Sequence, residues 1–145
     1  MKRLMIFLLA ALSAISTTAF AQERAYTEGP VTIVTSVRVA EGQGDTYMAW
    51  LQSGWKPNME AQKEAGVILS YSVQAIMPRS SDDPNLYLVV TYPNMASFDG
   101  LDERTEPLVN KALGNTREQR NQGNAERNAM RTILGSQMMR ARILK

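Results

Sequence analysis

Apolar and polar positions alternate with a period of two in four segments of this chain, which is typical of β-strands. These segments span residues 31–40, 67–77, 85–92 and 136–144. The first reads VTIVTSVRVA and is rich in β-branched residues, which favour strands. Only the polar loop 79–84 separates the second segment from the third, so the two are predicted to form an antiparallel hairpin.

Helical patterns fill the intervals between the predicted strands. We expect helices over residues 46–55, 58–65, 95–113 and 115–133. Asp45 and Asn94 precede two of these segments as candidate N-caps, and Gly66 follows one as a stop signal. Pro57 is expected to interrupt the first helical region because it lacks a backbone donor, and Gly100 is expected to break the third.

The resulting order, β-α-β-β-α-β, predicts an α+β fold of the ferredoxin-like type. Its four-stranded antiparallel sheet carries the helices on one face and leaves the other face uncovered in a monomer. The rows that we expect beneath the helices are Val31, Ile33, Val37, Val39, Leu69, Tyr71, Val73, Leu86, Leu88, Val90, Tyr92, Met139, Ala141 and Ile143.

The first 21 residues have the pattern of a cleavable signal peptide. Lys2 and Arg3 precede an apolar run over residues 4–12, and a stretch of small residues ends in Ala19-Phe20-Ala21. The apolar run is too short for a membrane span, which needs about 20 residues. We therefore expect export to the periplasm or the medium, with cleavage before Gln22.

After this cleavage the chain is expected to form one domain. Residues 22–29 are predicted to be a flexible segment, and residues 30–145 the folded part. Loss of Lys2 and Arg3 leaves 14 basic and 14 acidic residues, so the mature protein has no net charge and no electrostatic reason to bind nucleic acid or a membrane surface.

Two residue types are missing, and their absence excludes several kinds of chemistry. The chain contains neither Cys nor His. This removes thiol nucleophiles, Ser-His-Asp triads and His-ligated haem, and it removes nearly all zinc sites. We accordingly predict no metal site and no cofactor.

The uncovered sheet face provides the candidate binding site. Its residues are expected to be Ser36, Arg38, Ser70, Ser72, Gln74, Tyr87, Arg140 and Arg142, together with the apolar Val34, Ile68, Val89 and Met138. None of the four predicted strands contains an Asp or Glu to pair with the three Arg. A small anionic ligand would provide the missing partner, since guanidinium groups match carboxylates well. Alternatively, these Arg reach solvent at strand ends or pair with Glu41, Glu60 or Glu103.

The last helical segment carries a second group of arginines. Arg117, Arg120, Arg127 and Arg131 are interleaved there with Glu118 and Glu126. This charge pattern is typical of a solvated helix face, and we interpret it so.

Three stretches, SVRVAEGQGDTYMAWL, GVILSYSV and LYLVVTYPNMASFDGL, carry a resemblance to a known group of proteins. The chain resembles the dimeric α/β-barrel superfamily, which includes antibiotic-biosynthesis-monooxygenase-like, NIPSNAP-like and stress-responsive barrel proteins. The resemblance implies a homodimer in which two sheets pack face to face around a lumen that holds any ligand. Members with haem or metal activity usually depend on His, so their activity is not carried over.

Three functions are compatible with these features. The first is an exported, non-catalytic homodimer that binds a small anionic or amphipathic molecule. The second is a cofactor-independent, monooxygenase-like enzyme that uses Tyr87, Ser70 and Arg38. The third is a structural or partner-binding module without a lumen.

Overall fold

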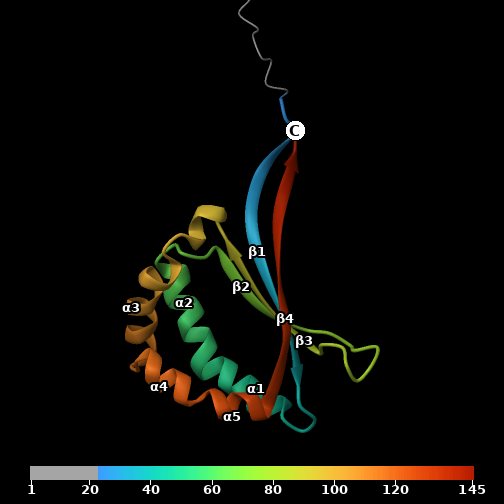
Figure 1. Ribbon diagram of the computed structural model, residues 1–145, viewed down its shortest axis with the longest axis vertical. Coiled ribbons are helices and arrows are strands. Elements are labelled where there is room, and N and C mark those ends of the chain that lie inside the picture. Colours follow the sequence, from blue (N-terminus) through green and yellow to red (C-terminus); the bar gives the residue numbers. More distant parts are fainter. Residues whose placement is uncertain (1–22) are drawn as a thin grey trace, which may run out of the picture.

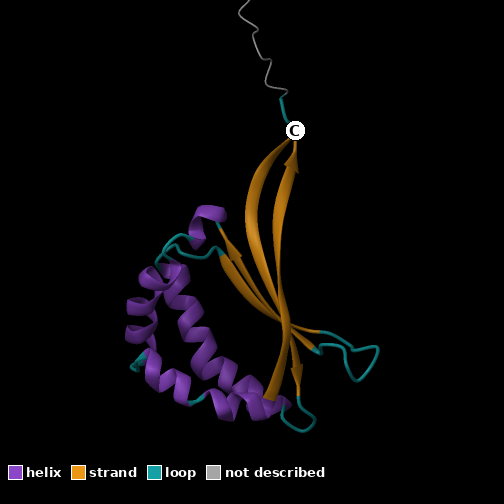
Figure 2. Cartoon of the chain, in the orientation of Figure 1, coloured by secondary structure: helices purple, strands orange, loops and turns teal. Residues whose placement is uncertain are grey.

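A four-stranded antiparallel sheet with helices on one side forms the protein (Figures 1 and 2). The computed structural model describes residues 23–145. The predicted signal peptide therefore lies outside the described residues. The elements in chain order are β1 (Tyr26–Val39), α1 (Gly44–Trp50), the π-helical turn η1 (Leu51–Trp55), α2 (Lys56–Glu64), β2 (Ser70–Ala75), β3 (Leu86–Tyr92), the 3-10 turn η2 (Met95–Phe98), α3 (Leu101–Leu113), α4 (Arg117–Gln122), α5 (Asn124–Met130) and β4 (Arg131–Leu144).

The strand order is that of the ferredoxin-like fold, which confirms the predicted fold class. The strands lie in the order β2-β3-β1-β4, and all neighbouring pairs are antiparallel. Both helical regions lie on the same side of the sheet, as Figure 2 shows, and the opposite face carries no helix. None of the helices within residues 23–145 is both long and apolar enough to cross a bilayer.

Pro57 does not interrupt the first helical region, contrary to the prediction. The helix runs on from α1 through η1 into α2, where Pro57 lies in the first turn. Immediately before it, the Lys56 N–H donates to the Leu51 carbonyl five residues back, as in a π-helix. This change of hydrogen-bond register accommodates Pro57, which has no backbone N–H to donate.

The second helical region is divided as the sequence indicated. Asn94 forms a capping box with Ser97 at η2, and Gly100, with a φ of 57°, separates η2 from α3. Thr116 and Gln119 form a second capping box at the start of α4. Two short helices, α4 and α5, thus replace the single polar helix expected over residues 115–133. Figure 1 shows α3, α4 and α5 following one another in an arc beside α1 and α2.

The core consists of two neighbouring clusters between the helices and β1–β3. One is formed by Val37, Tyr47, Leu51 and Leu86, and the other by Met59, Val67 and Ile68. The predicted helix-facing residues of β2 and β3 are divided between the clusters, with Leu88 at the first and Val90 at the second. Leu69, also expected beneath the helices, is instead 49% exposed. Ile68, expected on the open face, is buried because β2 begins only at Ser70.

The outer strands are longer than the sequence suggested. β1 begins at Tyr26, so residues 26–29, expected to be flexible, belong to the sheet, and β4 begins at Arg131 rather than at residue 136. Figure 1 shows both strands continuing beyond the helices as a two-stranded ribbon. As the edge strand, β4 is exposed at 13 of its 14 positions. The helices therefore do not cover Met139, Ala141 and Ile143, contrary to the prediction.

Candidate functional site

The open face of the sheet does gather most of the predicted ligand residues. Cross-strand pairs place Gln74 beside Tyr87 and Tyr87 beside Ser36, while Ser72 is opposite Val89. Ser70, opposite Thr91, lies four residues along β3 from Tyr87, a separation of roughly 14 Å at the usual rise of a strand. The open face is thus polar along β2, but Ser70 and Tyr87 do not form one compact catalytic group.

Arg38 lies at the end of this face and has a carboxylate partner. Its Nη1 is 3.3 Å from an Asp82 carboxylate oxygen and 3.2 Å from the Ser81 carbonyl oxygen. The loop between β2 and β3 supplies both groups, and beside Arg38 it borders a hollow of about 480 Å³. The alternative in which Arg38 is paired by a loop residue therefore describes the structure, although the residue is Asp82 rather than a Glu.

Arg140 and Arg142 lie on the other face of the sheet, which corrects their predicted placement. Arg140 is the cross-strand partner of Val31, a fully buried residue beneath the helices, and its Nε is 2.9 Å from the Glu28 carboxylate. Arg142 pairs with Glu28 in the register and packs its guanidinium over the Tyr26 ring at 4.8 Å. Glu28 escaped the analysis of the strands because β1 was predicted to begin at Val31.

The alternation along β4 was assigned to the wrong faces, and a bulge lies just before the predicted segment. The register shifts between Ser36 and Val37, where Gly135 and Ile133 are their partners on β4. Met138 consequently pairs with Ile33 on the helix side, and Met139 pairs with Thr32 on the open face. Both faces of this strand carry a mixture of apolar and polar side chains, so the alternation alone does not indicate which face lies on the helix side.

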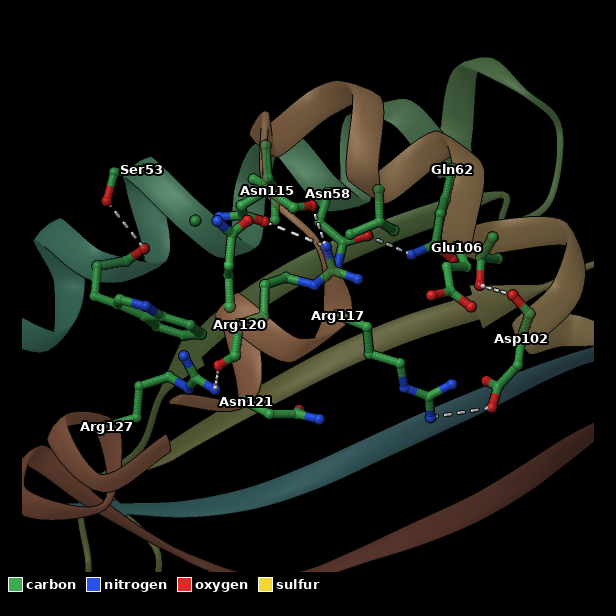
Figure 3. Close-up of a pocket in the computed structure, with 16 residues that line it drawn as sticks. Ser53, Asn58, Gln62, Asp102, Glu106, Asn115, Arg117, Arg120, Asn121 and Arg127 are labelled. Carbon is green, nitrogen blue, oxygen red and sulfur yellow. Dashed lines mark hydrogen bonds and ion pairs between the residues drawn. The ribbon is translucent and has the colours of Figure 1, made fainter. Parts of the chain in front are cut away.

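A cavity of about 560 Å³ lies within the helical layer, between α1–α2 and the arc formed by α3, α4 and α5 (Figure 3). The sheet contributes nothing to its lining. Its polar lining consists of Ser53, Asn58, Gln62, Asp102, Thr105, Glu106, Asn115, Arg117, Gln119, Arg120, Asn121 and Arg127. The volume falls in the range of small-molecule sites, about 300–1,000 Å³.

Arg120 is the best-anchored cation of this cavity. Its Nη1 donates to the Asn110 side-chain oxygen at 2.8 Å, and to the Asn115 carbonyl and side-chain oxygens at 2.8 and 3.2 Å. All three hydrogen bonds use the same nitrogen. Within the described residues Nη2 and Nε donate to no protein group, so the guanidinium is fixed in direction while one of its donor pairs stays available.

Arg127 closes the other side of the cavity and is held by an aromatic pair. Its guanidinium lies 5.4 Å from the centre of the Trp50 ring, and Trp50 is stacked on Tyr47 at 5.7 Å. Arg131 covers the Tyr47 ring at 5.8 Å. Burial, followed by the nearby charge of Arg131, lowers the pKa of Arg127. The two arginines, four residues apart, thus attach α5 and the start of β4 to α1.

Hydrogen-bond acceptors gather on the α2–α3 side. Gln62, only 7% exposed, donates through its side-chain nitrogen to Asn58 at 2.7 Å, and its side-chain oxygen accepts no hydrogen bond from the described residues. The half-buried Glu106 lies beside it (Figure 3) and makes no ion pair within residues 23–145. At the rim, Arg117 reaches Asp102 at 3.5 Å.

Arg120 and Arg127 do not lie on a solvated helix face, contrary to the prediction. Both are half-buried and bordered by the cavity, because α4 and α5 fold back toward α1. The capping-box residue Thr116 was the feature of the sequence that could have indicated a new helix here. Gly114, with a φ of 65°, ends α3, and the capping box of Thr116 begins α4 in a new direction.

Comparisons with known proteins give similarity in structure alone. No family model and no curated protein sequence matches the chain. The structure of HapK from Hahella chejuensis is similar, with 14% identity and a TM-score of 0.48 over 75% of this chain and 90% of that one. A dimeric ferredoxin-like protein from an uncultured marine organism gives 8% identity and a TM-score of 0.49 over 82% and 90%. A candidate antibiotic biosynthesis monooxygenase from Caulobacter crescentus gives 17% identity and a TM-score of 0.35 over 83% and 94%.

Proposed function

We propose that this protein is an exported, homodimeric domain that binds a carboxylate-bearing small molecule in the cavity between α2 and α3–α5. The observation that carries the proposal is the geometry of Arg120. Three hydrogen bonds through Nη1 fix its guanidinium, and Nη2 and Nε remain for a ligand. Such a donor pair matches the two oxygens of a carboxylate.

The charges around the cavity support an anionic ligand. Within the described residues the side chains of Arg120 and Arg127 donate hydrogen bonds only to neutral oxygens of Asn side chains and backbone carbonyls. Neither half-buried guanidinium makes an ion pair within residues 23–145, and the charge of Arg131 acts on Arg127 as well, so an anion in the cavity is favourable for both. We therefore place the ligand in the helical layer, whereas the sequence predicted a sheet-lined lumen.

Titration calorimetry with the mature protein tests the binding proposal. We expect a simple carboxylate such as 4-methylpentanoate to bind, and Arg120→Gln to lower its affinity by about tenfold or more. Arg79→Gln removes the same charge from an exposed loop position and serves as the control. Equal affinities of the two variants, or no binding by the wild type, would refute the proposed site. Melting curves of both variants verify that each one is folded.

Export follows from the pattern of the first 21 residues. We expect the protein in the periplasm or the medium, beginning at Gln22. N-terminal sequencing of the protein from its native host checks this. An intact Met1 on protein from the cytoplasmic fraction would contradict it.

The uncovered sheet supports the homodimer. Met139 on the open face is 49% exposed, and Ile143 and Leu144 at the end of β4 are 55% and 79% exposed. A long edge strand with this many exposed apolar side chains is a template for association unless a partner covers it. Sedimentation velocity at micromolar concentration should give a dimer, and a monomer would refute this part.

A further inference from the structure

We infer that the ligand of the helix cavity is a zwitterion, which carries an ammonium group in addition to the carboxylate, and that Glu106 binds the ammonium group. This inference rests on the proposed carboxylate site and deepens it. It starts from an imbalance of charge between the two sides of one cavity. Arg120 and Arg127 lie on one side and Glu106 on the other, and none of the three makes an ion pair within residues 23–145.

The donor side consists of groups from α4 and α5. The Arg120 guanidinium offers Nη2 and Nε, and that of Arg127 offers Nη1 and Nε, since its Nη2 makes both of its hydrogen bonds. No ion pair joins either arginine to an acid within residues 23–145. The arginine at the rim, Arg117, differs because Asp102 already neutralises it.

The acceptor side consists of groups from α2 and α3. In Figure 3 the Glu106 carboxylate and the Arg120 guanidinium face the same space from opposite walls. The adjacent Gln62 is fixed by its bond to Asn58, which leaves its side-chain oxygen as a second acceptor. An ammonium group has three donors and no acceptor, so it fits a carboxylate beside an amide oxygen.

A ligand with a single charge would pair with the charged groups on only one wall of the cavity. A simple carboxylate leaves Glu106 half-buried and unpaired in the narrowed, occupied cavity, and desolvation of an unpaired charge is unfavourable. A primary amine likewise leaves the charges of the two arginines half-buried and unpaired. A molecule with both groups neutralises each wall and adds no net charge, so the structure favours an amino acid over its deaminated counterpart.

Calorimetry with three matched probes tests this inference: L-leucine, 2-hydroxy-4-methylpentanoate, in which a hydroxyl replaces the ammonium group, and 3-methylbutylamine, which lacks the carboxylate. 6-Aminohexanoate serves as a zwitterion with more widely separated charges. We expect one of the two zwitterions to bind at least about tenfold more tightly than the hydroxy acid and the amine. Glu106→Gln should abolish that preference and leave the affinity for the hydroxy acid unchanged or higher.

Glu103→Gln provides the control, because Glu103 is exposed on the same helix and does not line the cavity. Circular dichroism of both variants verifies the fold. Equal binding of the hydroxy acid and both zwitterions, or an unchanged preference in Glu106→Gln, would overturn the zwitterion inference while the carboxylate site stands. If none of the carboxylate-bearing probes binds to the wild type, the proposed function fails as well.

Discussion

Replacing Tyr47 with Phe should stabilise this protein, although Tyr47 is one of its most deeply buried side chains. Tyr47 is 0% exposed, and its hydroxyl has no hydrogen-bond partner among the described residues. Burial has the largest effect on the pKa of Tyr47 and raises it, while the nearby Arg131 lowers it. The hydroxyl is therefore buried as a neutral group without compensation.

The change in the free energy of unfolding follows from the hydroxyl that the substitution removes and the aromatic ring that it keeps. A buried hydroxyl without a partner costs about 1–3 kcal/mol. Loss of one oxygen atom leaves a void of roughly 10–15 Å³, which costs about 0.3 kcal/mol. Phe keeps the ring that stacks on Trp50 at 5.7 Å. We expect Tyr47→Phe to raise the free energy of unfolding by about 1 kcal/mol and the melting temperature by about 4 °C.

Urea unfolding followed by circular dichroism measures this difference, and Tyr71→Phe is the matched control. The Tyr71 hydroxyl donates to the Glu60 carboxylate, so the same chemical change should there lower the free energy of unfolding by about 1 kcal/mol. The two Tyr→Phe substitutions are thus expected to have opposite signs. A loss of 1 kcal/mol or more in Tyr47→Phe, with an unchanged urea dependence, would refute the reasoning and identify Arg131 as a true partner.

Three further predictions concern pH, an ion pair and association. The hydrogen bond to Glu60 raises the pKa of Tyr71 from 10.0 to about 12. The stabilising effect of this hydrogen bond should therefore be complete below pH 10 and be lost as the pH rises to about 12. Urea unfolding across this range should show the loss in the wild type and not in Tyr71→Phe. Arg140→Met should lower the free energy of unfolding by less than about 1 kcal/mol, and by less still in high salt, because the ion pair with Glu28 is partly exposed; a loss of 3 kcal/mol would indicate a buried pair. Met139→Lys should raise the dimer dissociation constant by about tenfold or more in sedimentation experiments, and an unchanged constant would place the interface elsewhere.

Local pattern was sufficient for the element order and hence for the fold class. The alternation in β1 and β3, the break at Gly100 and the cap at Asn94 are properties of neighbouring residues, and each is found in the structure where the sequence placed it. The helix-facing rows of β2 and β3 were predictable for the same reason, because a strand covered on one face must be apolar there.

Tertiary structure alone decided which way β4 faces. This edge strand is uncovered on both sides, so neither of its rows has to be apolar, and Met138 and Met139 give no preference. A bulge opposite Ser36 and Val37 then sets the register. The early start of β1, which brings Glu28 to Arg140, escaped prediction because the Gly29-Pro30 pair interrupts the alternation.

The cavity depends still more on tertiary packing. Its walls come from α2 and α3 on one side and from α4 and α5 on the other, and no sequence spacing relates Gln62 or Glu106 to Arg120. The sequence by itself determined the charges on the last helices. Whether Arg120 faces solvent or a cavity was decided only when α5 packed against α1 and α4 came to line the cavity, because burial is a property of packing between distant segments and not of local pattern.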